Sequence, residues 1–192
     1  MPIYITPGPD GAMWCTELVG NKIARITPQG EVKEFTIPTP NSRPIALVLA
    51  PDKKSLWFSE EAGSNVARID RSGGVTEFPL PRPRRGSLLG GLCFDASGHL
   101  WVQCYDADVD GDTGETIRAA GAEGGGAAGG VAPDYLARFE ALPVPGSGVA
   151  VSYHTVPSRR SILHRVIPGP DGVLWFTEMG EDRVGVLTEA AR

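Results

Sequence analysis

Short apolar or alternating runs, separated by turn residues, fill most of the chain. In the first unit these runs are Ile3–Thr6, Ala12–Glu17, Lys22–Ile26 and Val32–Ile37. They are rich in Ile, Val, Phe, Trp and Thr and are bounded by Pro-Asp-Gly or Asn, a pattern typical of β-strands. Pro-Asp-Gly suits a tight turn because Pro presets φ and Gly tolerates positive φ. The sequence shows no long run of helical periodicity, so it predicts an all-β protein.

The same pattern returns along the chain with tryptophan as a landmark. The four tryptophans, separated by 43, 44 and 74 residues, are Trp14, Trp57, Trp101 and Trp175. PGPDGAMWCTE, APDKKSLWFSE, FDASGHLWVQC and PGPDGVLWFTE surround them, and NKIARI, SNVARI, DYLARF and DRVGVL follow in the same order. Four landmarks in one order indicate an internal repeat of about four units.

Each unit has the size and strand content of a propeller blade, about 43 residues with four short strands. We therefore predict a single β-propeller domain over residues 1–192. The blades are expected at about 2–43, 44–86, 87–161 and 162–192, the third carrying an insertion at 106–133. The tryptophans are interpreted as packing between blades.

The fourth unit predicts only three strands, Leu163–Ile167, Val173–Glu178 and Arg183–Leu187. The sequence thus predicts an arc of nearly four blades, with an apolar blade face left open at each end. Two arcs closing into one ring, a longer propeller and a decaying remnant all fit this pattern. We favour a homo-oligomer in which one arc closes with a second.

Composition narrows the classes of function. The chain has 192 residues, 41% apolar and 21% charged, and a net charge of −5, which argues against nucleic-acid binding. It holds no apolar run of membrane-spanning length and its first residues carry no signal-peptide pattern, so we expect a cytoplasmic protein. Three cysteines without CxxC spacing indicate neither a disulfide framework nor a zinc site.

The insertion opens with an acidic motif. Asp106, Asp108 and Asp110, followed by Gly111 and Asp112, have the spacing of a calcium-binding loop. A complete loop of this kind needs Glu at its twelfth position, which here is Ile117. The motif therefore fits either a Ca²⁺ loop over 106–112 or a solvated acidic loop.

The motif GPDGxLWFTE, followed by NKIARIT and GxVxEFxIP, resembles the streptogramin B lyase (virginiamycin B lyase) family of seven-bladed propellers. The resemblance covers the chain outside the insertion. It implies a carbon–oxygen lyase that confers antibiotic resistance by linearising a cyclic depsipeptide such as a streptogramin B. The ring would open by elimination at the ester bond, with Mg²⁺, rather than by hydrolysis. Such chemistry needs a base for a proton beside a carbonyl and a cation for the developing enolate.

The resemblance also implies site residues. His164, on the inner strand of the fourth unit, corresponds to the general base, and Glu178 to a metal ligand. Two further groups of the family pattern are absent, because Ile162 stands where a carboxylate is implied and Gly90 where a histidine is implied.

Other carboxylates share the position of Glu178, three residues after tryptophan. These are Glu17 and Glu60, and either could add a metal ligand from a partner arc. The alternative is structural, a turn cap or an ion pair with the recurring Arg25 and Arg68.

Two alternatives to a lyase remain open at this point. One is a propeller that binds a ligand or partner without catalysis, and the other is a lactone hydrolase with a cation-lined channel. The other two histidines are not expected to belong to a functional site. His99 is expected at an exposed turn, and His154 on an outer strand away from the axis.

Overall fold

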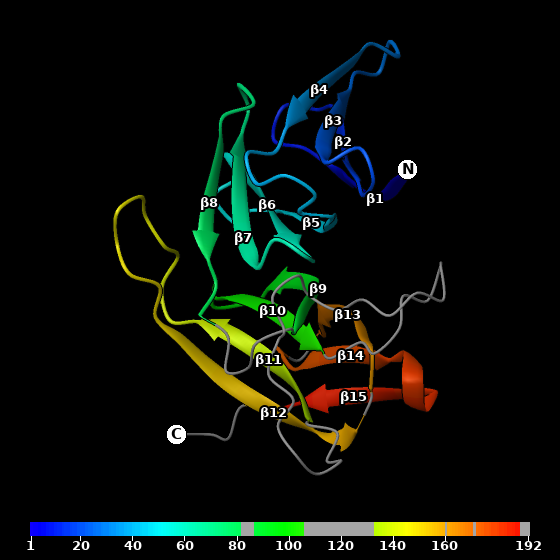
Figure 1. Ribbon diagram of the computed structural model, residues 1–192, viewed down its shortest axis with the longest axis vertical. Helices are drawn as coiled ribbons and strands as arrows, with labels where there is room; N and C mark the ends of the chain where they lie inside the picture. The colour runs from blue at the N-terminus through cyan, green and yellow to red at the C-terminus, as the bar shows by residue number, and fades with distance from the viewer. Residues whose placement is uncertain (82–86, 106–132, 160, 171, 189–192) are drawn as a thin grey trace.

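A computed structural model describes residues 1–81, 87–105, 133–159, 161–170 and 172–188 of the chain. Four antiparallel sheets follow one another round an axis and form an incomplete circle (Figure 1). The gap lies between the sheet that contains β1 and the sheet that contains β13, on the right of Figure 1. The predicted fold, a partial β-propeller, is confirmed.

The sheets are built from consecutive strands, in the orders β1-β2-β3-β4, β5-β6-β7-β8, β12-β11-β10-β9 and β13-β14-β15. The strand bounds are β1 Pro2–Pro7, β2 Met13–Glu17, β3 Lys22–Ile26, β4 Val32–Thr36, β5 Pro44–Leu49, β6 Ser55–Glu60, β7 Asn65–Asp70, β8 Val75–Pro79, β9 Leu88–Phe94, β10 Leu100–Tyr105, β11 Pro133–Phe139, β12 Val151–Arg159, β13 Leu163–Pro168, β14 Leu174–Glu178 and β15 Arg183–Leu187. A single 3₁₀ turn, Met179–Glu181, joins the last two strands. No helix in the described ranges is long and apolar enough to cross a membrane.

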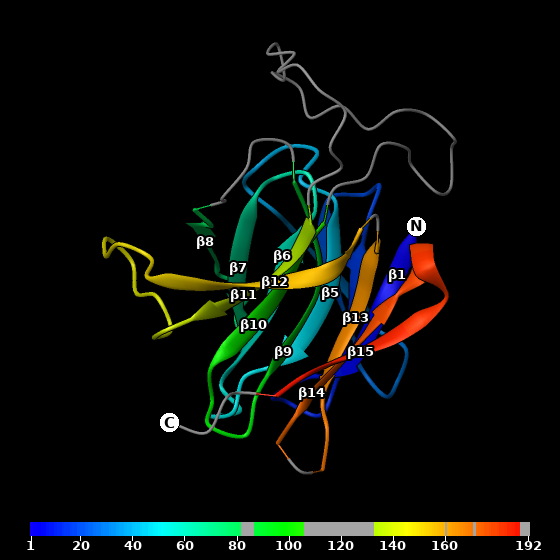
Figure 2. The same ribbon diagram turned by 90° about the horizontal axis from the view of Figure 1, so that it is seen from below.

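The innermost strand of each sheet lines the axis. β5 contacts β1 on one side and β9 on the other, and β9 in turn contacts β13. In Figure 2 the inner strands β5, β9 and β13 run lengthwise next to one another. Because each later strand is added by a short hairpin, the sheets extend outward from the axis as blades.

Three tryptophans hold neighbouring blades together, as the sequence predicts. Trp14 of the first sheet packs with Leu47 and Phe58 of the second in one buried cluster. Trp57 and Trp101 belong to the clusters that join the second sheet to the third and the third to the fourth. The tryptophan face of one blade therefore covers the opposite face of the next, which is how the repeat buries its core.

Polar side chains, two residues after each of these tryptophans, cross the same interfaces. Thr16 Oγ1 donates to the carbonyl of Ile45 at 3.0 Å, and Ser59 Oγ donates to the carbonyl of Gly90 at 2.7 Å. Gln103 Nε2 reaches the carbonyl of Arg165 at 2.9 Å. Each bond satisfies a backbone oxygen of the next inner strand, so it fixes the position of one blade against the next.

The recurring arginine does not pair with the recurring glutamate, so that part of the structural alternative is wrong for Arg25. Arg25 Nε donates to Asp10 Oδ2 at 2.5 Å, and Trp14 Nε1 donates to Asp10 Oδ1 at 3.0 Å. Trp14 and Arg25 are directly paired across β2 and β3, whereas Glu17 faces Lys22 at the far end of that pairing. The aspartate of the Pro-Asp-Gly turn is therefore the arginine's partner.

Candidate functional site

The predicted site residues lie at one end of the axis, where every inner strand begins and every second strand ends. The pairs across these two strands are Pro2 with Glu17, Pro44 with Glu60, Leu88 with Tyr105 and Leu163 with Glu178. His164 follows Leu163 by one residue on the inner strand β13. The repeat thus brings the implied base and the recurring glutamates to the same level of the first, second and fourth blades.

His164 is half-buried and faces charges from two sheets. Burial lowers its pKa below the ordinary value, and the neighbouring cation of Arg165 lowers it further. The negative charge of Glu61 acts in the opposite direction and raises it. The imidazole is therefore neutral at pH 7, the form that can accept a proton.

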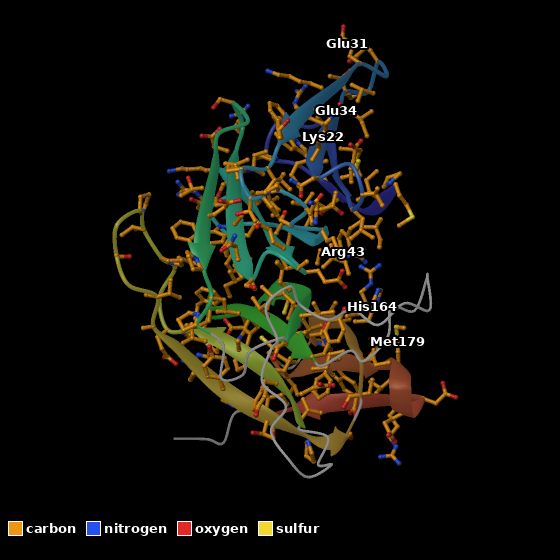
Figure 3. The ribbon with its side chains drawn as sticks, viewed as in Figure 1. Lys22, Glu31, Glu34, Arg43, His164 and Met179 are labelled. Carbon is orange, nitrogen blue, oxygen red and sulfur yellow. The ribbon has the colours of Figure 1, made fainter. Side chains whose placement is uncertain are left out.

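Glu61 belongs to a polar cluster that joins the second and third blades. Tyr105 Oη donates to Glu61 Oε1 at 2.5 Å, and Arg43 Nε donates to Glu61 Oε2 at 2.7 Å. Glu61 is buried, so its charge is compensated by a guanidinium and a hydroxyl rather than by water. Figure 3 labels both Arg43, which directly precedes the inner strand β5, and His164, which lies on the inner strand β13. Through Glu61 the cluster acts on the imidazole with negative charge, opposite to the positive charge of Arg165.

The backbone is strained where two of these inner strands begin. Arg43 and Ile162 hold equivalent places, directly before Pro44 and Leu163, and both have positive φ, 55° and 46°. Neither residue type favours this region, and a β-branched isoleucine favours it least. Such strain is concentrated at functional sites in proteins. It therefore supports this end of the axis as the site.

Glu178 lies near this site but turns away from His164. It is only 5% exposed, and its Oε2 has no hydrogen-bond partner among the described residues. A Cβ placed on Gly185 would come within 2.8 Å of Glu178 Oε1, so the carboxylate lies against β15, on the side away from β13.

Glu60 is fully buried at the end of β6. Asn65 Nδ2 donates to Glu60 Oε2 at 2.9 Å. Burial raises the pKa of Glu60 to about 8, and the nearby negative charge of Glu77 adds to the effect. Glu60 therefore carries a proton at neutral pH, which makes it a poor metal ligand as it stands. Glu17 is half-buried at the equivalent place of the first blade.

Gly90 is closed to any larger side chain in this backbone. A Cβ there would lie 2.7 Å from the carbonyl oxygen of Leu163 and 3.3 Å from Cε1 of Tyr105. The histidine that the resemblance implies at this position therefore does not fit without a backbone shift. The Tyr105 ring occupies the neighbouring space, so a phenol stands close to where an imidazole is implied.

The described residues do not fit the magnesium site that the resemblance implies. Within those ranges no three His, Cys, Asp or Glu side chains are placed to share a metal ion. Ile162 offers no ligand, Glu178 faces β15 and Glu60 is protonated. The possible calcium loop of Asp106, Asp108 and Asp110 lies outside the described residues.

The other two histidines lie away from this site. His99 is half-buried rather than exposed, because its Nδ1 lies 3.2 Å from Asp95 Oδ2 and its Nε2 3.5 Å from Arg138. His154 is on the outermost strand β12 and its ring is tilted over Trp101, with centroids 5.0 Å apart. The three cysteines are buried, and the described residues contain no disulfide bond.

A separate cavity of about 420 Å³ lies between the third and fourth sheets. Asp95 is the carboxylate among its described lining residues, and it already accepts hydrogen bonds from Trp101 and His99. The other polar side chains among the described lining residues are the hydroxyls of Ser97 and Thr188, and no histidine is among them. The chemistry of the chain therefore centres on His164.

The fold and the cluster round His164 define a β-propeller with a polar site at one end of its axis. Residues 1–112 match the model of the virginiamycin B lyase family, and the chain belongs to that family. The virginiamycin B lyase of Nocardia farcinica (strain IFM 10152) is 40% identical over 52 residues, which are 27% of this chain and 19% of that protein.

Solved structures of the family agree along nearly the whole chain. Virginiamycin B lyase from Staphylococcus aureus is 29% identical, with a TM-score of 0.72 over 98% of this chain. A catalytically inactive histidine-to-alanine variant of that enzyme with quinupristin gives a TM-score of 0.71 at 29% identity over 97% of this chain. In both comparisons the chain covers 52% of the other protein, so it spans about half the length of these relatives.

Sequence reasoning missed Glu61, Arg43 and Tyr105 as members of the site. Glu61 and Tyr105 occupy the same place in consecutive blades, four residues after the tryptophan, but their residue types differ. A search for recurring residues cannot find such a pair. The signal that the sequence offers for Glu61 is that it follows Glu60 directly. Consecutive side chains of a strand point in opposite directions, so the two acids have different surroundings.

Proposed function

We propose that this chain acts as a lyase on a cyclic depsipeptide or related ester, with His164 as the base. The neutral imidazole, half-buried on an inner strand and subject to the positive charge of Arg165, is the observation that carries the proposal. A histidine-to-alanine variant of the S. aureus relative is catalytically inactive, which supports a histidine in this role.

In the proposed reaction His164 takes a proton from the carbon beside a carbonyl. The electron pair of that C–H bond forms a carbon–carbon double bond, and the adjacent C–O bond of the ester breaks. The ester carboxylate leaves with the electron pair and no water is consumed. Atoms and charge balance with an imidazolium, a carboxylate and an unsaturated residue as products.

Positively charged side chains of this chain can stabilise the anions that form in this step. Arg165 acts on His164 electrostatically, and Arg43 is anchored by Glu61 in the same cluster. Positive charge fixed in place favours a developing enolate and the departing carboxylate over the neutral ester. Because the described residues do not gather ligands for magnesium, no step of this proposal is assigned to a metal.

The second candidate is a propeller that binds a ligand without turning it over. The closed position at Gly90 and the absence of a shared metal-ligand group within the described ranges favour it. The two candidates differ in whether His164 is needed for chemistry or only for binding.

Replacing His164 with Ala tests the proposal. Ring opening of a streptogramin B depsipeptide is followed by mass spectrometry, and binding is measured by calorimetry. His154→Ala is the matched control, because His154 lies on the outermost strand. We expect at least a hundredfold loss of turnover for His164→Ala alone, in line with the loss of a general base. Equal turnover in both variants would remove His164 from the reaction, and binding without turnover in the unaltered protein would favour the second candidate.

A further inference from the structure

Positive charge gathers in a pocket between the first and second blades, although the chain as a whole has a net charge of −5. The pocket has a volume of about 290 Å³. Its described lining consists of three cations, one carboxylate and one aromatic ring, which are Arg25, Lys33, Arg71, Asp10 and Phe35. Asp10 forms an ion pair with Arg25. Three positive charges and one negative charge leave a net charge of +2 in the lining.

Two of these cations are direct neighbours in the first sheet. Arg25 on β3 is paired with Lys33 on β4, so their side chains lie on the same face. In the second and third blades the place of Lys33 is held by Thr76 and Ser152. Two like charges in direct opposition on neighbouring strands destabilise a sheet. The paired cations are therefore not a requirement of the blade repeat, and an anion bound between them would offset their repulsion.

The third cation comes from the second blade. Arg71 lies in the turn between β7 and β8, which lies beside β4 in Figure 1. Gly73 of this turn has a φ of 95°, and its Cα lies so close to the ring of Phe35 that a Cβ would overlap it. Asp70 Oδ1 accepts a hydrogen bond from the amide of Ser72 at 2.8 Å. The carboxylate of Asp70 therefore fixes its own turn and holds Arg71 next to the first blade.

Neither Lys33 nor Arg71 has an ion-pair partner among the residues that the structure describes. Glu34 follows Lys33 directly, but it points to the opposite face of the sheet and pairs with Lys22. Lys33 Nζ lies over the ring of Phe35, 5.0 Å from its centroid. Both Lys33 and Arg71 are exposed, so an anion can reach them from solvent.

The pocket belongs to an internal joint of the chain. Trp14 packs against the second blade, and it is paired with Arg25 across β2 and β3. Arg25 and Lys33 therefore lie on the side of the first blade that the second blade covers, and all four strands of both blades are described. Trp175, by contrast, is 41% exposed on a blade face that no described blade covers.

We propose that this pocket binds a phosphate group, either free or in a monoester. A phosphate monoester carries nearly two negative charges above its second pKa of about 6, which matches the charge of the lining. Guanidinium groups bind phosphate oxygens through paired hydrogen bonds. Arg25 is already oriented by Asp10, so it loses little side-chain freedom on binding.

The pocket is separate from the site round His164. Asp10 lies before the start of β2, whereas Glu17, at the level of His164, ends that strand. The inference therefore does not rest on the proposed function.

Titration of the full chain with inorganic phosphate, followed by the amide signals in nuclear magnetic resonance, tests the proposal. Sodium chloride at equal ionic strength is the reference, because exposed cations attract any anion weakly. We expect saturable shifts at Lys33 and Arg71 that chloride does not produce. Lys33→Gln and Arg71→Gln should each weaken phosphate binding about tenfold or more, since each removes a charge-assisted hydrogen bond. Lys54→Gln removes an exposed cation outside the pocket and should leave binding unchanged.

The same titration with methyl phosphate distinguishes the two sources of the group. Tighter binding of methyl phosphate supports a monoester as the ligand, and tighter binding of inorganic phosphate supports the free ion. Shifts that do not saturate with either probe, equal shifts in chloride, or binding that survives both Lys33→Gln and Arg71→Gln would each overturn the proposal. Near-ultraviolet circular dichroism checks that each variant keeps its fold, which is expected because both residues are exposed.

Discussion

The hydroxyl of Tyr105 donates to Glu61 Oε1 at 2.5 Å, although the two residues are 44 positions apart and belong to different blades. Both residues lie four positions after their tryptophan, so the repeat places them at one level of neighbouring blades. This bond joins the third blade to the Arg43–Glu61 ion pair of the second. Through Glu61 it is connected to the electrostatics of His164.

Replacing Tyr105 with Phe should destabilise the protein by about 1–3 kcal/mol, because Glu61 Oε1 is then buried without this donor. Urea denaturation measures the change in the free energy of unfolding. Tyr4→Phe is the control, since the Tyr4 ring would still lie under the guanidinium of Arg165. Equal stability of the two variants would show that the Tyr105 bond contributes nothing.

The pKa of His164 should lie below its ordinary value of 6.5, and two substitutions should move it in opposite directions. Arg165→Gln removes a like charge and should raise the pKa, whereas Glu61→Gln removes an opposite charge and should lower it. Nuclear magnetic resonance titration of the imidazole carbon-bound protons measures these shifts. Lys33→Gln, on the outer strand of the first blade, should change nothing.

The lowered pKa of His164 also makes the stability of the folded protein depend on pH. A histidine whose folded-state pKa is lowered binds fewer protons in the folded state than in the unfolded state near pH 6. Its contribution to stability therefore falls as the pH drops below 6.5 and is complete above that value. A titration of His164 at or above 6.5 would contradict the burial and charge arrangement at this site.

Glu60→Gln should stabilise the protein at pH 8 and have little effect at pH 5. The pKa of Glu60 is raised to about 8, so the folded state binds more protons than the unfolded state between the ordinary value of 4.5 and about 8. Stability is consequently lost as the pH rises through that window, by roughly 1.4 kcal/mol per pH unit. Glutamine mimics the protonated carboxyl and removes this loss.

Thermal unfolding at pH 5 and pH 8 checks the prediction for Glu60. Glu31→Gln, at an exposed position of the first blade, is the matched control. An equal loss of stability between pH 5 and pH 8 in the unaltered protein and in Glu60→Gln would show that Glu60 is not the buried acid described above.

Much of the fold follows from the sequence because strand alternation and turn chemistry are local. The tryptophan spacing predicted the blades, and β2, β3 and β15 begin or end within one residue of their expected bounds. The packing of Trp14 between blades followed from its recurrence. The exposure of Trp175 could be anticipated only in part, because it depends on which blade faces lie next to each other.

The site was less accessible to sequence reasoning because its contacts cross from one blade to another. The family resemblance pointed to His164 and Glu178, yet it cannot say that the Glu178 carboxylate turns toward β15. The sequence pattern marks Asp10 as a turn residue and does not show that it is also the partner of Arg25. His99 is expected at an exposed turn, but its ring contacts Asp95 and Arg138, and the order of residues along the chain does not show the contact with Arg138 of β11.

The most direct test of the central claim is the mass of the product that forms from a streptogramin B depsipeptide. The account predicts a linear product of unchanged mass, with a new carbon–carbon double bond that absorbs in the ultraviolet, and its loss in His164→Ala. A product heavier by one water would indicate hydrolysis. That result, or a depsipeptide that stays intact, would contradict the account.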